Sequence, residues 1–74
     1  MCGIIGIASN KLVASNIIQS LKKLEYRGYD SAGIATIADG EINEKKCTGR
    51  VDNLERMLFK NPSNGSLGIG HVRW

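Results

Sequence analysis

Residues 12–40, LVASNIIQSLKKLEYRGYDSAGIATIADG, decide the fold because they place a helix, a strand and a tight turn in direct succession. Val13, Ile17, Leu21 and Leu24 recur at spacings of four, four and three, so they lie on one face of a helix. This stretch therefore predicts an amphipathic helix that buries one apolar side.

Residue types that typically start or end a helix stand at both ends of this stretch. Ser9 and Asn10 are residue types that cap helix N-termini well. Lys22 and Lys23 stand in the last turns, where positive charge complements the helix dipole, and Gly28 is the residue type that ends helices. We expect a helix within residues 12–28, with Ser9 or Asn10 as its N-cap and Gly28 as its C-cap.

Strands are predicted on both sides of the helix. Residues 2–9 are apolar and β-branched with two glycines, which indicates a buried strand. Residues 32–38, AGIATIA, predict a second strand, and Asp39-Gly40 is typical of a two-residue hairpin turn. Residues 41–47 would pair back as a third strand, more polar and at an edge of the sheet.

The rest of the chain adds one helix and one strand. Residues 51–60 show helical spacing of apolar side chains, residues 61–66 are rich in loop-forming residues, and residues 67–74 are strand-like. The predicted order is strand, helix, strand, strand, helix, strand. This order places the chain in the α+β class.

The length of the chain limits what it can build. Its 74 residues make at most one small domain, and a chain of this size buries only about 60% of its unfolded surface. The sequence stops at Trp74 within strand-like residues, and its helices and strands need a further layer that these residues do not supply. We expect residues 1–74 to be the front part of a longer domain.

Composition argues against nucleic-acid and membrane proteins. The net charge is +3, from ten Lys and Arg against seven Asp and Glu, and the basic residues are scattered. No dense basic run or aromatic series suits nucleic acid. No apolar stretch approaches the roughly 20 residues of a membrane-spanning helix, and the N-terminus lacks the pattern of a signal peptide.

The cysteines indicate free thiols in a reducing compartment. Cys2 and Cys47 could form one disulfide, but without a signal peptide we expect a cytoplasmic protein in which both stay reduced. Together with His71 they lack the paired spacing of a zinc site. We expect no metal and no cofactor.

Cys2 is the first candidate for chemistry. Its small size predicts removal of Met1, which would leave a thiol and a free α-amine on one residue. The amine is partly unprotonated near neutral pH and can take the thiol proton directly or through one water. The alternative is a small buried residue at the start of a strand.

A second candidate lies in LEYRGYDSAG, residues 24–33. The predicted helix end and the following strand bring Arg27, Tyr29, Asp30 and Ser31 together in a loop beyond the strand ends, where binding residues often occur. The alternative is a capping glycine followed by a solvated turn.

The third candidate is GIGHVRW, residues 68–74. Arg73 carries a planar charged fork that suits a carboxylate, and Trp74 could form the wall of a pocket. His71 could be a base or a ligand, although a lone histidine on a strand is more often structural. Alternation places His71 and Arg73 on one face of the strand, with Val72 and Trp74 on the other. Arg73 could also be a surface residue with no partner.

Taken together, MCGIIGI, LEYRGYDSAGIA and GIGHVRW resemble the class II glutamine amidotransferases, which are N-terminal-nucleophile hydrolases. The resemblance covers the whole chain and implies an incomplete α/β/β/α sandwich. Within the class it is greatest to the branch that converts fructose 6-phosphate into glucosamine 6-phosphate. Amidophosphoribosyltransferases typically have His-Arg-Gly-Gln where this chain has Tyr26-Arg27-Gly28-Tyr29. Val72 is a departure, because the branch usually has threonine there.

The resemblance implies a role for each matching residue. Cys2 would attack the side-chain amide of glutamine, with its own α-amine as general base. Arg73 would bind the glutamine α-carboxylate and Trp74 would line the pocket. Arg27 and Gly28 would hold the cysteine end in place. Glutamine is the expected substrate, with fructose 6-phosphate and a homo-oligomeric assembly only in the full-length enzyme.

The resemblance also implies parts that these residues do not contain. A Thr-His-Gly segment, an Asn-Gly oxyanion hole, an aspartate for the substrate amine and the sugar-isomerase domains would all follow Trp74. Losing one oxyanion donor alone typically costs about 10²–10³ in rate, so we expect the 74 residues to be inactive alone. Two alternatives stay open: a non-catalytic remnant or interaction piece of a disrupted gene, and the glutaminase part of another class II enzyme such as an amidophosphoribosyltransferase.

Overall fold

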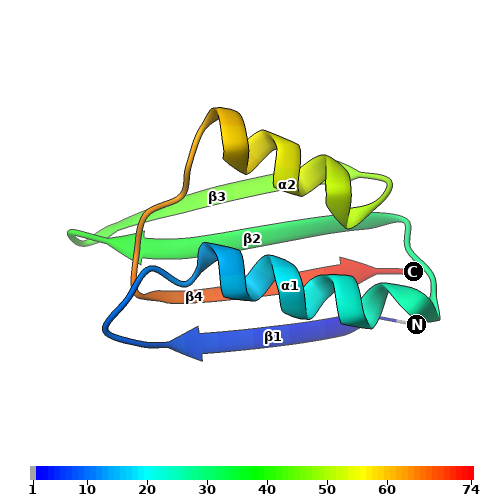
Figure 1. The fold of residues 1–74 in the computed structure, drawn as a ribbon, viewed down its shortest axis with the longest axis horizontal. Helices are drawn as coiled ribbons and strands as arrows, with labels where there is room; N and C mark the ends of the chain where they lie inside the picture. The colour runs from blue at the N-terminus through cyan, green and yellow to red at the C-terminus, as the bar shows by residue number, and fades with distance from the viewer. Residues whose placement is uncertain (1) are drawn as a thin grey trace.

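The computed structural model describes residues 2–74, which form one four-stranded antiparallel sheet with both helices packed on one face (Figure 1). The strand order is β1-β4-β2-β3. The α+β class and the predicted order of strands and helices are confirmed. The elements are β1 (Gly3–Ala8), α1 (Ala14–Leu24), the 3-10 helix η1 (Glu25–Arg27), β2 (Ser31–Ala38), β3 (Glu41–Thr48), α2 (Val51–Lys60) and β4 (Leu67–Arg73).

The core lies between the two helices and the sheet. The predicted helix face is confirmed, because Val13, Ile17 and Leu21 are fully buried. A glycine in β4 allows the close approach of α1: a Cβ on Gly70 would lie 2.5 Å from Cγ2 of Ile17. The other buried apolar residues are Ile18, Ala32, Ile34, Val51, Leu54 and Val72.

The start of α1 differs from the prediction. The helix begins at Ala14, and Val13 is the N-cap residue without a side-chain cap. The predicted cap, Ser9, accepts a hydrogen bond from the backbone N–H of Lys11 at 3.1 Å. The serine oxygen therefore stabilises a turn before the helix, a local alternative that capping residues commonly adopt.

The end of α1 also differs in detail. The α-helix ends at Leu24 and the chain continues through η1, which Gly28 terminates with a φ of 115°. Lys22 and Lys23 lie in the last turn of α1 as predicted. Gly28 is therefore the cap of the short 3-10 helix and not of α1 itself.

The second half of the chain follows the prediction closely. Asp39 and Gly40 have φ values of 54° and 77°, the left-handed conformations that a tight hairpin turn requires. β3 pairs only with β2 and forms an edge of the sheet. α2 has the predicted bounds, and β4 ends one residue before the predicted strand end at Trp74.

The face of the sheet opposite the helices is open to solvent. Ile4 on β1 is 83% exposed and Ile69 on β4 is 63% exposed. The prediction of a buried strand over residues 2–9 is therefore wrong, because β1 lies at an edge of the sheet and its residues alternate between half-buried and exposed. Ile42 on β3 and Leu67 on β4 are also exposed. The sheet therefore has one face packed by helices and, among residues 2–74, one face without a covering layer, on which these apolar side chains lie together with charged ones such as Arg73 and Lys46. None of the helices in this part of the chain is long and apolar enough to cross a membrane.

Candidate active site

The antiparallel pairing of β1 with β4 brings the two ends of the sequence together. Gly3 pairs with Val72, so the residues just outside this pair meet at one end of the sheet, where the N and C labels lie close together in Figure 1. The Cys2 thiol lies 3.9 Å from the carbonyl oxygen of Trp74, although the two residues are 72 positions apart. Cys2 is exposed. The fold therefore places the candidate nucleophile beside the candidate binding residues.

The last residues of the chain, Val72, Arg73 and Trp74, differ in what surrounds their side chains. Val72 is 1% exposed and packs on the helix side, whereas the Arg73 side chain on the opposite face is 72% exposed. The alternation predicted for β4 is thus observed at these two positions. Trp74 follows the strand and lies with its indole ring against Gly28. A Cβ on Gly28 would lie 2.7 Å from two ring atoms of Trp74.

The loop that follows Gly28 is held against the end of β4. The Asp30 backbone N–H donates to the Arg73 carbonyl at 2.7 Å. The Asp30 carboxylate lies 3.8 Å from a terminal nitrogen of the Arg73 guanidinium. On the other side, the Gly49 N–H donates to the Asp30 carbonyl at 2.8 Å. The predicted gathering of loop residues beside the strand end is observed for Asp30.

A buried carboxylate, that of Glu25, holds the segment before this loop in place. Glu25 in η1 is 9% exposed and accepts a hydrogen bond at 2.7 Å from the backbone N–H of Val51, the first residue of α2. Its other oxygen lies 3.4 Å from Arg50, whose guanidinium stands 5.2 Å from the centre of the Tyr29 ring. Glu25 therefore caps α2 and fixes the turn that leads into Gly28. No local pattern in the sequence links residue 25 to a helix that begins at residue 51, so the sequence alone does not predict this role.

The other candidate residues are placed as follows. Arg27 is the last residue of η1, and its side chain lies outside the described part of the structure, as does Met1. His71 is half-buried over Gly33, where a Cβ would lie 2.5 Å from its Nε2 atom. Among residues 2–74 no group of three or more His, Cys, Asp or Glu side chains could hold a metal ion.

The two thiols differ sharply in their surroundings. Cys2 and Cys47 are both free, so the disulfide alternative is wrong for this structure. Cys47 is half-buried against the core, and burial raises the pKa of its thiol because the thiolate is poorly solvated there. Of the two thiols, that of Cys2 is therefore the more accessible to solvent.

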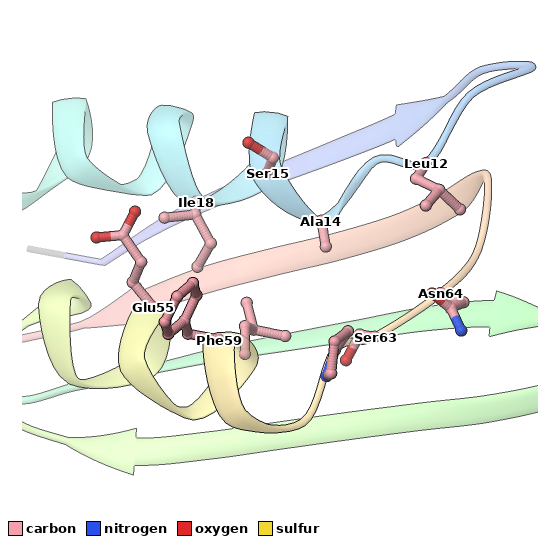
Figure 2. Close-up of a pocket in the computed structure, with 10 residues that line it drawn as sticks. Leu12, Ala14, Ser15, Ile18, Glu55, Phe59, Ser63 and Asn64 are labelled. Atoms are coloured by element: carbon pink, nitrogen blue, oxygen red, sulfur yellow. The ribbon is translucent and has the colours of Figure 1, made fainter.

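A separate pocket of about 310 Å³ lies between α1 and α2 (Figure 2). Its walls are mostly apolar and include Ile18, Leu58 and the 91% exposed Phe59. Glu55 at its edge is paired with Lys22 at 2.7 Å. None of the candidate catalytic or binding residues lines this pocket, which is distinct from the cluster around Cys2.

Comparison with known proteins gives strong sequence matches. No protein-family model matches the chain. The chain is 55% identical over all 74 residues to the glutamine–fructose-6-phosphate aminotransferase (isomerizing) of Clostridium acetobutylicum, and 57% identical to that of Bartonella quintana. It is 54% identical to the enzyme of the same name from Mesorhizobium japonicum. In each case it spans 12% of the relative, at the N-terminal end.

Proposed function

We propose that residues 1–74 are the N-terminal part of a class II glutamine amidotransferase domain, in which Cys2 hydrolyses the side-chain amide of glutamine. The observation that carries the proposal is the approach of the Cys2 thiol to the end of β4, next to Arg73 and Trp74. A nucleophile and a cationic carboxylate partner on adjacent strands suit a small amino-acid substrate. The similarity to enzymes named glutamine–fructose-6-phosphate aminotransferase supports this choice of substrate.

The proposed reaction uses two groups of one residue. After removal of Met1, the α-amine of Cys2 takes the proton of the thiol, and the thiolate adds to the amide carbon of glutamine. The amine then returns that proton to the amide nitrogen, the carbon–nitrogen bond breaks and ammonia leaves. Water loses a proton to the amine and attacks the resulting thioester. The carbon–sulfur bond breaks, the departing sulfur takes that proton back from the ammonium, and glutamate is released. The exposed position of Cys2 leaves room for both the substrate and the water.

Arg73 and Trp74 would bind the other end of the substrate. Neighbouring strands lie about 4.8 Å apart, so a ligand the size of one amino acid can reach from Cys2, just before β1, to Arg73 at the end of β4. The guanidinium presents two parallel donors to the α-carboxylate, a geometry that lysine cannot reproduce. The Trp74 ring, which is 65% exposed and lies against Gly28, would form the wall beside it.

We propose that further chain completes the domain. The open sheet face exposes Ile4, Ile69, Ile42 and Leu67, and large exposed apolar patches typically mark surfaces that another layer covers. The chain spans 12% of its relatives, which leaves ample sequence for a second sheet and an oxyanion hole. We therefore expect the 74 residues alone to lack measurable glutaminase activity.

The role of the whole protein follows from the same relatives. We propose that the released ammonia converts fructose 6-phosphate into glucosamine 6-phosphate in a full-length, homo-oligomeric, cytoplasmic enzyme. The identity of 51–57% to aminotransferases of that name favours this acceptor over a phosphoribosyl acceptor.

The experiment that tests the proposal is a chimera. The first 74 residues of this chain replace the matching segment of the Clostridium acetobutylicum enzyme, and glutamate release from glutamine is measured. We expect activity in the chimera and a loss of at least about 10³-fold in Cys2→Ala, because the nucleophile is absent. The matched control is Cys47→Ala, which removes the other thiol and should keep activity. A folded chimera without activity, or one in which Cys2→Ala stays active, would contradict the proposal.

A further inference from the structure

We propose that Asp30 is a positioning residue that orients the Arg73 guanidinium toward the substrate carboxylate and thereby sets the affinity for glutamine. This inference rests on the proposed function, because it assumes that Arg73 binds the substrate. It assigns a task to Asp30, a residue of the loop between η1 and β2.

The backbone of Asp30 is fixed on both sides. Its N–H donates to the Arg73 carbonyl at 2.7 Å, and its carbonyl accepts from the Gly49 N–H at 2.8 Å. The next residue, Ser31, begins β2 and pairs in register with Arg73. The carboxylate of Asp30 is therefore presented to Arg73 from a backbone that two neighbouring segments hold in place.

The Arg73 side chain needs such a partner. It is 72% exposed, and a long exposed arginine samples many rotamers unless another group restricts it. In the described part of the chain, Asp30 is the acidic residue within ion-pair distance of its guanidinium, at 3.8 Å. Restricting the rotamers before substrate arrives lowers the entropy that binding must remove.

The geometry also leaves Arg73 free to bind. The contact involves one terminal nitrogen of Arg73 and one oxygen of Asp30, and not a two-point pairing of both groups. The guanidinium has five N–H donors in a planar fork, so another edge stays available for a two-point contact with the substrate. A carboxylate that instead competed with glutamine would occupy that edge.

The test uses the chimera and compares Asp30→Ala, Asp30→Glu and the control Glu44→Ala. Glu44 and Lys46 form an ion pair of 3.6 Å on β3, similarly exposed and on the edge strand, so Glu44→Ala breaks a comparable contact elsewhere. Exposed ion pairs typically contribute enough to change an equilibrium by about two- to fivefold. We expect Asp30→Ala to raise the KM for glutamine by about that factor and to leave kcat within about twofold.

The conservative variant distinguishes positioning from a structural role. Asp30→Glu keeps the charge and should bring KM back toward that of the unsubstituted chimera, while Glu44→Ala should change neither constant. An unchanged or lower KM in Asp30→Ala would overturn the inference, the lower value indicating competition with substrate. A parallel loss of kcat and thermal stability, without rescue by Asp30→Glu, would overturn it as well.

The same experiment separates this inference from the proposed function. If the unsubstituted chimera neither hydrolyses glutamine nor is protected by glutamine from alkylation at Cys2, the proposed function fails and the inference fails with it. If the chimera is active and Asp30→Ala behaves like Glu44→Ala, only the role of Asp30 is wrong.

Discussion

Substitution of Gly28 by alanine should disturb the candidate site through two separate effects. Gly28 has φ 115° and ψ 161°, a backbone conformation that is essentially restricted to glycine and costs other residues about 1–3 kcal/mol. In addition, the new Cβ would lie 2.7 Å from two atoms of the Trp74 ring. The Gly28 N–H donates to the Glu25 carbonyl at 2.9 Å and holds the backbone at this point. The indole must therefore move away from the loop.

Gly40→Ala is the matched control. Gly40 also has a positive φ, 77°, but no atom lies within 4 Å of the added Cβ. Its substitution therefore carries the backbone cost of a left-handed residue, about 1–2 kcal/mol, without a steric clash. The difference between the two variants isolates the contact with Trp74.

Tryptophan fluorescence gives a direct assay, because Trp74 is the single tryptophan of the chain. We expect acrylamide to quench Trp74 more strongly in Gly28→Ala than in the unsubstituted chain, and Gly40→Ala to match the unsubstituted chain. Urea unfolding should show a larger stability loss for Gly28→Ala than for Gly40→Ala. Equal quenching and equal stability in the two variants would refute the packing of Trp74 on Gly28.

Three further predictions follow from burial and charge. Glu25→Ala removes the acceptor of the Val51 N–H and should lower the free energy of unfolding by about 1.5–3 kcal/mol, the range for hydrogen bonds to charged groups. Urea midpoints measure this, and a loss below about 0.5 kcal/mol would contradict the capping role. In the isolated 74-residue chain, Ile17→Ala should cost about 2–5 kcal/mol because Ile17 is fully buried, whereas Ile4→Ala in the 83% exposed position should change stability by less than about 0.5 kcal/mol. Equal losses would show that the packed face is misassigned. At a pH below the raised pKa of its thiol, Cys47 should be alkylated more slowly than Cys2, because burial disfavours its thiolate, and the difference should disappear in denaturant. Mass spectrometry of an alkylation time course measures both rates, and equal rates in the folded chain would contradict the prediction.

Local patterns predicted most of the fold. The spacing of apolar residues in α2 and the Asp39-Gly40 turn depend on neighbours within a few positions, and both were predicted correctly. The start of α1 was predicted wrongly because Ser9 has two local uses, a helix cap and a turn, and the turn is the one observed. Sequence alone does not decide between two local hydrogen bonds of similar strength.

The candidate site depends on contacts between distant residues. The pairing of β1 with β4 brings Cys2 to Trp74 across 72 positions, and Glu25 reaches the N-terminus of α2 across 26 positions. The resemblance to class II amidotransferases singled out Cys2 and Trp74 but gave no reason to notice Glu25. Tertiary contacts of this kind leave no periodicity in the sequence, so only the structure shows them.

The most direct test of the central claim is the intact mass of the chimera before and after treatment with a glutamine-mimicking diazoketone. We predict an untreated mass without Met1, one adduct that peptide mapping assigns to Cys2, and loss of that adduct when glutamine is in excess. Retention of Met1, or labelling that excess glutamine does not prevent, would contradict the assignment of Cys2 as an N-terminal nucleophile.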